Sequence, residues 1–251
     1  MKRKLANVMI AVLLLLALVF GYLAFKEYKP LIESDIQTDA IKEVAVEESN
    51  DPFDRYIDFE SLKKINKDII GWIYIPNTSI DYPIFRGTTT NEYLYKDSEG
   101  RYSPIGSIFT FADSSDYLSD ANQFIFGHSM REFKMFGELR MYREDSNYRK
   151  NNNTMYIYTE RKTSMVKLFS VFTCNQLDDI FKHKMELGTP EYLDRVSDLQ
   201  SRNQYKDINQ DIDVDWVNSQ IYSLSTCHGT VGTPYRLLVN WVTVKEKYLI
   251  S

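Results

Sequence analysis

The chain has 251 residues and a formal net charge of −5 at pH 7, with only two cysteines and three histidines. Binding to nucleic acid needs a basic face, so this acidic balance argues against a nucleic-acid partner. A chain longer than roughly 200 residues also buries a sufficient core without disulfides, so each cysteine needs a reason of its own.

Residues 5–25 form a run of 21 positions without a charged side chain, long enough to cross a bilayer as one helix. The basic tail 1–4 precedes this run, so the positive-inside rule predicts a cytoplasmic N-terminus and an exported remainder. A cleaved signal peptide is the alternative. The run is longer than the usual apolar region of about 7–15 residues and no A-x-A-like site follows it. We therefore expect a single-pass signal anchor in the cell membrane at 5–25.

Residues 26–50 contain seven acidic and three basic residues, a composition typical of a stalk or loose helix between membrane and domain. We expect the folded catalytic domain at 51–251. It opens with a short amphipathic helix, because cap-type residues precede a helical stripe of Ile57, Leu62 and Ile65.

The remainder alternates turn signals with short runs rich in aromatic and β-branched residues, which predict strands. These runs are two within 72–85, and one each in 106–111, 122–128, 154–160, 165–174, 221–227 and 235–244. Two helices are predicted, at 134–143 and at 189–205, the second with Thr189 as N-cap and Pro190 in its first turn. Many short strands with few helices indicate a mainly β fold, a closed or nearly closed β-barrel.

The stretch "STCHG" at 225–229 places His228 directly beside Cys227. A cysteine nucleophile requires thiolate character and a partner for the proton, usually histidine. Neighbouring residues on a strand point to opposite faces, so His228 is the weaker candidate for this base. A disulfide between Cys174 and Cys227 is a second possibility. Cys174, at a strand end, is itself expected to be a small core residue.

The other two histidines and Arg236 have functional and structural interpretations. His128 ends the apolar strand 122–128 directly after Gly127; it is either a group placed for chemistry where the strand meets a loop, or a structural strand end. His183 lies among charged residues and is expected to be solvated. Arg236 opens the last strand, as a surface cation or as a fixed charge that stabilises a developing oxyanion.

The chain resembles the sortases, membrane-anchored transpeptidases of Gram-positive bacteria, and their class B in particular. "LSTC" at 224–227 followed by Arg236 is similar to the family's cysteine signature. "FGHSM" (126–130) with "KMFGEL" (134–139) resembles the class B histidine region. The segments 62–85, 91–97 and 106–111 match that class in order and spacing, as does the long helix before the cysteine strand. The resemblance covers residues 51–244.

The resemblance implies Cys227 as nucleophile, His128 as general acid/base and Arg236 as stabiliser of the substrate carbonyl and oxyanion. It implies a sortase-like closed barrel that needs no cofactor or metal. The groove residues that it implies are Leu94, Phe126, Ser225, Thr90 and Asn91. His228 departs from the Thr, Ser or Asp that the family usually has there, and we expect it to tune the pH dependence or the choice of acceptor.

The implied reaction cleaves a sorting-signal peptide at a threonine carbonyl through a thioacyl-enzyme. An amine, usually of the peptidoglycan cross-bridge, then takes over the acyl group, which attaches surface proteins to the cell wall. Three other functions stay open: polymerisation of pilins, hydrolysis by a cysteine peptidase, and binding of wall peptides without turnover. Hydrolysis differs from transfer only in acceptor binding and water exclusion. A binding module would have no need of a thiol.

Overall fold

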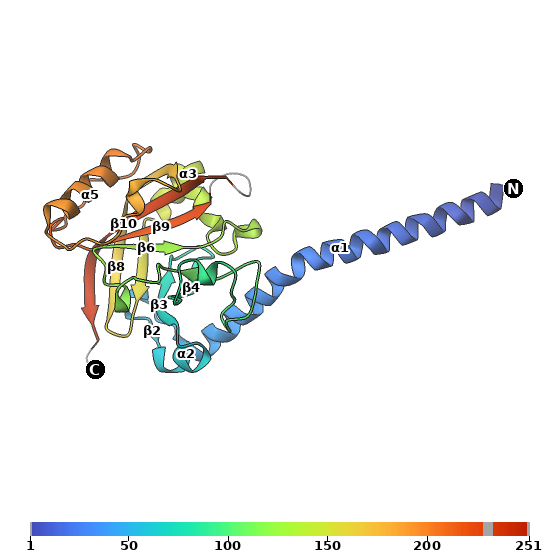
Figure 1. The fold of residues 1–251 in the computed structure, drawn as a ribbon, viewed down its shortest axis with the longest axis horizontal. Helices are drawn as coiled ribbons and strands as arrows, with labels where there is room; N and C mark the ends of the chain where they lie inside the picture. Colours follow the sequence, from blue (N-terminus) through green and yellow to red (C-terminus); the bar gives the residue numbers. More distant parts are fainter. Residues whose placement is uncertain (1, 228–232, 250–251) are drawn as a thin grey trace.

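The protein is built around a closed barrel of eight strands, from which a long helix projects (Figure 1). The computed structural model describes residues 2–227 and 233–249. The barrel strands are β3 (Ile69–Tyr74), β4 (Asp81–Phe85), β5 (Ile108–Phe109), β6 (Asn122–Phe126), β7 (Thr154–Tyr158), β8 (Lys162–Asn175), β9 (Ile221–Cys227) and β10 (Tyr235–Tyr248). Their order around the barrel is β10-β8-β7-β3-β4-β5-β6-β9. The prediction of a mainly β fold with a closed barrel of about eight strands is confirmed.

Each predicted strand corresponds to an observed one, but β8 and β10 are longer than their predicted ranges. Each has 14 residues, and the two pair antiparallel along their length. Two pairings are parallel, β4 with β5 and β6 with β9. Because β6 and β9 run in the same direction, their C-terminal ends lie at the same end of the barrel.

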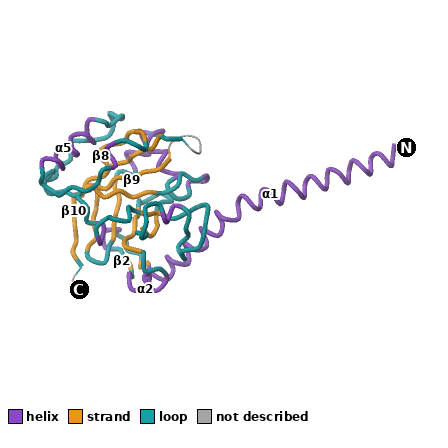
Figure 2. Tube along the Cα trace, in the orientation of Figure 1, coloured by secondary structure: helices purple, strands orange, loops and turns teal. Residues whose placement is uncertain are grey.

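Successive side chains along each strand point alternately into the barrel and toward its outer face. The interior is occupied by buried residues that include Ile73, Ile84, Ile125, Ile157, Val166, Leu224, Val239 and Trp241. A second cluster forms on the outer face of β6, β8, β9 and β10, where α5 (Pro190–Ser201) packs: Phe124, Phe169, Phe172, Leu238, Tyr192, Val196 and Leu199. Figure 2 shows α5 lying beside these strands.

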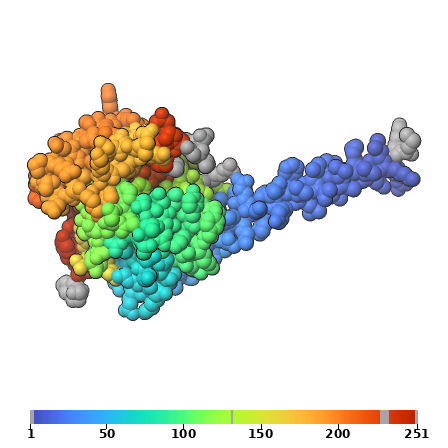
Figure 3. All heavy atoms as spheres, in the orientation of Figure 1, coloured from blue at the N-terminus to red at the C-terminus, as the bar shows by residue number. Residues whose placement is uncertain are grey.

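Helix α1 (Lys2–Ala45) is continuous from the apolar run to the barrel. It is long and apolar enough to cross a membrane, and the apolar side chains of its first half are exposed on the part that projects from the barrel (Figure 3). Its second half behaves differently, because Leu31, Ile41 and Ala45 are buried. Part of the segment expected to be a stalk is therefore packed on the domain.

The C-terminal end of α1 is attached to the barrel by a buried ionic cluster. Asp81 on β4 accepts two hydrogen bonds from the guanidinium of Arg55, at 2.9 and 3.0 Å, and one from the Trp72 indole at 2.6 Å. Lys42 of α1 lies 3.2 Å from the same carboxylate. The Arg55 side chain is only 1% exposed, so this pairing offsets the cost of burying its charge.

The remaining helices are short, and two predictions need correction. α2 (Phe59–Ile65) begins after Asp58, which caps Ser61 N at 3.0 Å, but Ile57 of the predicted stripe lies in a strand and Ile65 is exposed. The helix predicted at 134–143 is wrong in its first turn, where Met135 has a positive φ of 51°. The other elements are β1 (Val46–Glu47), β2 (Tyr56–Ile57), α3 (Met141–Glu144), α4 (Ser146–Asn151), and the 3₁₀ turns η1 (Pro52–Asp54), η2 (Glu92–Leu94), η3 (Asp116–Leu118), η4 (Arg131–Phe133), η5 (Gly137–Arg140) and η6 (Asp179–Phe181).

Helix α5 starts where the sequence predicts. Thr189 Oγ accepts a hydrogen bond from Tyr192 N at 3.3 Å, and Pro190 occupies the first turn. The helix ends at Ser201 rather than at 205, because Arg202 closes it through its backbone N–H.

A ladder of buried polar side chains fixes the register of the strands under α5. Asn122 Nδ2 on β6 donates to Ser223 Oγ on β9 at 2.9 Å, and Ser223 Oγ donates to Asn240 Oδ1 on β10 at 2.8 Å. Asn240 Nδ2 continues to the Ser170 carbonyl on β8 at 3.3 Å. Since each of these groups is shielded from water, a shift of one strand would leave several of them unpaired.

Candidate active site

The topology brings the three predicted catalytic positions to one end of three adjacent strands. Arg236 on β10 is the direct register partner of Cys227 on β9. β6 pairs with β9 up to Phe126 and Ser225, and the Gly127 amide continues the pairing with a 3.3 Å hydrogen bond to the Ser225 carbonyl. His128 therefore follows β6 at the level of Cys227.

These three positions also share the parity of the outer face. On β10, Leu238 belongs to the cluster under α5, and Arg236 lies two residues before it. On β6, Phe124 belongs to that cluster, and His128 lies four residues after it. Position 227 has the parity of Ile221, a further member of the cluster. The candidate site thus lies on the outer wall of the barrel and not inside it.

Cys174 occupies the other side of Arg236, as its register partner on β8. It carries a free, buried thiol, and burial raises its pKa to about 12. β10 separates the two cysteine positions, which places their Cα atoms about 10 Å apart, beyond the reach of a disulfide at about 7 Å. The strand order therefore excludes the alternative of a disulfide between Cys174 and Cys227, and the expectation that Cys174 is a core residue is confirmed.

His128 is half-buried, and its ring is oriented by a contact with the segment that precedes β5. Its Nε2 lies 2.8 Å from the Leu94 carbonyl oxygen, and its ring lies 5.7 Å from that of Tyr95. Burial lowers the pKa of His128 below its ordinary 6.5, while the hydrogen bond to Leu94 opposes this shift. A carbonyl only accepts, so Nε2 carries hydrogen and Nδ1 is the nitrogen at which the neutral ring can take up a proton.

Gly127 allows His128 to sit close to the barrel wall. A Cβ at this position would lie 2.5 Å from Ile108 Cδ1 and 2.9 Å from the Phe136 ring. Phe136 N in turn donates to the His128 carbonyl at 2.9 Å. The glycine before the histidine is thus required by packing, since a side chain would push the strand end away from β5.

Arg236 directs its guanidinium at neutral oxygens. Nη2 donates to Gln176 Oε1 at 2.7 Å, and Nη1 donates to the carbonyls of Thr233 and Tyr235 at 2.9 and 3.0 Å. Among the described residues, no carboxylate is paired with it. Because its charge is not neutralised there by a carboxylate, Arg236 can stabilise an oxyanion that develops on a neighbouring group.

Two of the predicted groove residues lie side by side on β6 and β9. Phe126 and Ser225 are register partners. Phe126 contacts an aromatic cluster, with its ring 4.8 Å from Phe111 and 6.4 Å from Phe181. The Oγ of Ser225 is buried without a hydrogen-bond partner in the described part of the chain. An apolar wall with an unpaired hydroxyl beside it is suited to an extended peptide.

The other three predicted groove residues belong to the segment around η2. Leu94 is half-buried and packs against the cluster that contains Phe109, and its carbonyl faces His128. Thr90 and Asn91 are exposed and precede η2, with Asn91 in the left-handed region at φ 63°. The structure therefore brings Leu94 to His128, whereas Thr90 and Asn91 lie further along the loop.

Sequence reasoning missed some neighbours of the site and misjudged His183. The His183 side chain is 12% exposed, its ring stacks on Phe111 at 4.1 Å, and Nε2 lies 3.0 Å from Asp113 Oδ1. The expectation of a solvated histidine is wrong, because the loop after β8 folds back over β6. Gln176 and Phe181 belong to this same loop, and no sequence signal marked them. His228 lies outside the described residues.

Comparison with known proteins gives a consistent result. No family model matches the chain. It is 30% identical to Sortase B of Staphylococcus aureus over 181 residues, which are 72% of each protein. The X-ray structure of Clostridium perfringens sortase B is 28% identical, with a TM-score of 0.66 over 74% of this chain and 100% of that one. A Staphylococcus aureus sortase B–substrate complex has the same identity and TM-score, over 75% and 85% of the two chains.

Proposed function

Because this chain belongs to the sortase family as a class B-like cysteine transpeptidase, we propose that Cys227, His128 and Arg236 are its catalytic residues. The observation that carries this assignment is the register of β6, β9 and β10. It places the three positions at one end of adjacent strands and on one face. The same enzyme would attach surface proteins, with a sorting-signal peptide as its substrate.

The first half of the reaction forms a thioester. The Cys227 thiolate attacks the carbonyl carbon of a threonine in the peptide, and Arg236 stabilises the oxyanion. As the C–N bond breaks, a protonated His128 donates its proton from Nδ1 to the leaving amine. The acyl group of the peptide then remains on the cysteine sulfur.

The second half transfers the acyl group to an amine. Neutral His128 takes the proton from the acceptor amine, which attacks the thioester carbon and releases the thiolate. We propose the amine of a peptidoglycan cross-bridge as this acceptor. Because burial lowers the pKa of His128, its imidazolium form is a minority at neutral pH, so only part of the enzyme is competent for acylation.

Three groove residues would place the peptide. Leu94 and Phe126 offer apolar surface, and Ser225 offers a buried hydroxyl without a partner among the described residues. Thr90 and Asn91 would contact the part of the peptide that lies further from the scissile bond. Residues 5–25 of α1 would anchor the enzyme in the membrane, with the tail 1–4 in the cytoplasm and the barrel outside.

A transfer assay on the full chain in detergent micelles tests this proposal. The protein is incubated with a library of sorting-signal peptides, with and without an amine acceptor, and products are followed by mass spectrometry. We expect cleavage in wild type and its loss in Cys227→Ala, His128→Ala and Arg236→Ala, with Cys174→Ala as the active control. Cleavage by Cys227→Ala at the wild-type rate would exclude the mechanism.

A further inference from the structure

We propose that helix α1, besides linking the domain to the apolar segment, is a positioning element for His128, through Asp35 and Gln37. This inference rests on the proposed role of His128 in the reaction. Two loops determine where His128 lies: the loop between Tyr95 and Ser107, which follows Leu94, and the loop between Ser129 and Met135. Helix α1 is bonded to both of them.

The first attachment joins α1 to the loop that follows Leu94. Gln37 Nε2 donates to Asp97 Oδ2 at 3.1 Å. Asp97 also organises its own loop, since its Oδ1 accepts from the Glu99 and Arg101 amides at 3.0 and 2.9 Å. Helix α1 thus contacts Asp97, the residue that stabilises the turn of this loop.

The C-terminal end of this loop, at Ser107, is hydrogen-bonded to residues on either side of Leu94, whose carbonyl oxygen contacts His128. Ser107 N donates to the Tyr93 carbonyl at 2.9 Å, and Ser107 Oγ donates to the Lys96 carbonyl at 2.8 Å. Between these bonds lies Leu94, whose carbonyl oxygen is 2.8 Å from His128 Nε2. A displacement of the loop would therefore move the hydrogen-bond acceptor of the imidazole.

The second attachment joins α1 to the loop that follows His128. Lys134 Nζ lies 2.8 Å from Asp35 Oδ2, and Met135 belongs to the same buried cluster as Leu31 of α1. Met135 forms a bridge with Ser129, next to His128 in the chain. The Ser129–Met135 bridge therefore closes this loop, and Lys134 and Met135 hold it against α1.

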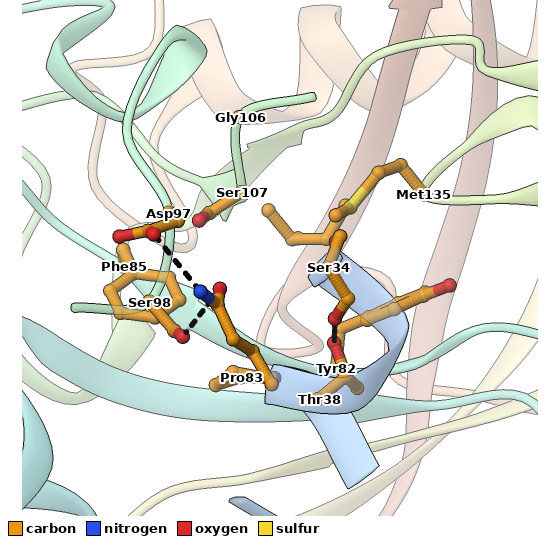
Figure 4. Close-up of a pocket in the computed structure, with 12 residues that line it drawn as sticks. Ser34, Thr38, Tyr82, Pro83, Phe85, Asp97, Ser98, Gly106, Ser107 and Met135 are labelled. Carbon is orange, nitrogen blue, oxygen red and sulfur yellow. Dashed lines mark hydrogen bonds between the residues drawn. The ribbon is translucent and has the colours of Figure 1, made fainter. Parts of the chain in front are cut away.

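Figure 4 shows how closely the helix and the two loops meet. Ser34 and Thr38 on α1 line a narrow cleft together with Asp97, Ser107 and Met135 of the two loops. The free space in this cleft is about 20 Å³, room for about one water molecule. Residues of α1 and of both loops therefore border the same small cavity, close to the polar attachment at Asp97.

The two attachments should affect the rate of the reaction more than the stability of the fold. The Asp35 and Lys134 side chains are 41% and 31% exposed, so the ion pair alone adds little to the stability of the fold. Catalysis is more sensitive than stability, because a misplacement of about 1 Å can cost roughly a hundredfold in rate. We therefore expect the loss of both attachments to change kcat much more than the unfolding temperature.

The experiment uses the full chain in detergent micelles and compares the double variant Asp35→Asn/Gln37→Ala with Lys42→Ala. Lys42 also joins α1 to the barrel, but its partner is Asp81 on β4 and not a residue of either loop. We expect the double variant to lose about tenfold in kcat with KM unchanged within about twofold, and Lys42→Ala to keep wild-type kcat. The charge swap Asp35→Lys/Lys134→Asp should restore kcat relative to Asp35→Lys alone.

NMR titration measures the pKa of the His128 imidazole directly. This pKa would not change if α1 only stabilised the fold. Loosening of the Leu94 loop hydrates His128, so the pKa of His128 should rise toward 6.5 in the double variant. Wild-type kcat together with an unshifted His128 pKa would overturn the inference, and so would equal losses in the double variant and in Lys42→Ala.

Failure of the proposed function gives a different pattern. If His128→Ala cleaves peptides as fast as wild type, the catalytic assignment of His128 is excluded. The NMR titration still decides whether α1 positions the ring, since it does not depend on turnover. An active enzyme that requires His128 but ignores both α1 substitutions would leave the function intact and exclude only the positioning role.

Discussion

The Leu94 carbonyl accepts a hydrogen bond from His128 Nε2 at 2.8 Å. This relationship fixes the tautomer, because a carbonyl oxygen only accepts. In the proposed reaction, Nδ1 would then be the nitrogen that gives a proton to the leaving amine and takes one from the acceptor. The position of the Leu94 carbonyl would thus matter for that reaction, although Leu94 carries no reacting atom.

Gly106→Ala should disturb this carbonyl directly. Gly106 has φ +64°, and a Cβ there would lie 2.4 Å from the Leu94 carbonyl oxygen. Gly100→Ala is the matched control, because Gly100 has φ +78° with no atom within 4 Å of its added Cβ. Both variants bear the backbone strain of roughly 1 kcal/mol. We expect a kcat loss of roughly tenfold or more in Gly106→Ala alone, measured by peptide cleavage; equal kcat in the two variants would refute it.

The two cysteines should differ sharply in alkylation. Cys174 is 7% exposed and burial raises its pKa to about 12, so at neutral pH it is a shielded thiol without nucleophilic character. Iodoacetamide on the folded protein should modify Cys227 alone, and peptide mapping by mass spectrometry would locate the label. Modification of Cys174 at a similar rate in the folded chain would contradict this description of the β8 end.

Asp81→Asn should destabilise the fold in a pH-dependent manner. Burial alone would raise the pKa of Asp81, but its hydrogen bonds with Arg55 and the charges of Arg55 and Lys42 outweigh burial and lower it below 3.8. The contribution of the carboxylate is thus complete above its ordinary pKa and is lost as the pH falls through the lowered value. We expect about 3 kcal/mol of destabilisation near neutral pH, shrinking at low pH.

Chemical denaturation of the full chain in micelles, repeated over a pH series, measures this difference between wild type and Asp81→Asn. Glu60→Gln is the control, since Glu60 forms only an exposed pair with Lys64. A difference that stayed constant down to the lowest pH would show that the charge of Asp81 does not carry the effect.

Ser223→Ala should weaken the polar ladder under α5. Ser223 Oγ both accepts from Asn122 and donates to Asn240, so its loss leaves two buried amides with unpaired groups. The expected cost is about 1–3 kcal/mol in the free energy of unfolding. Ser197→Ala on the exposed side of α5 is the comparison, with an expected change within about 0.5 kcal/mol. Equal stability of the two variants would show that the ladder does not hold the strand register.

Turn residues and short runs rich in aromatic and β-branched residues predicted the strands of the barrel, because such side chains favour extended backbone and turns separate the runs. The lengths of β8 and β10 were not predictable, since the polar residues Lys162 and Glu246 at their ends pair with each other across the strands at 2.5 Å. The first turn of the predicted helix at 134–143 failed because Met135 takes a positive φ to bridge back to Ser129.

At the site, the sequence indicated candidate residues through their chemical type and through the family resemblance. It could not show that Arg236 lies opposite both cysteine positions, because register depends on pairing partners far away in the chain. His183 was misjudged for the same reason: its charged sequence neighbours indicate a surface, but a loop closure stacks it on Phe111. The attachment of α1 to the loops around His128 likewise depends on tertiary contacts alone.

Intact-mass analysis of the acylated enzyme tests the central claim most directly. The full chain is mixed with a cleavable sorting-signal peptide without an amine acceptor, quenched in acid and digested, and the acyl adduct is located. We predict an adduct of the N-terminal peptide fragment on Cys227, absent from Cys227→Ala and released by added amine. Turnover of the peptide without any adduct on Cys227, or an adduct on Cys174, would contradict the account.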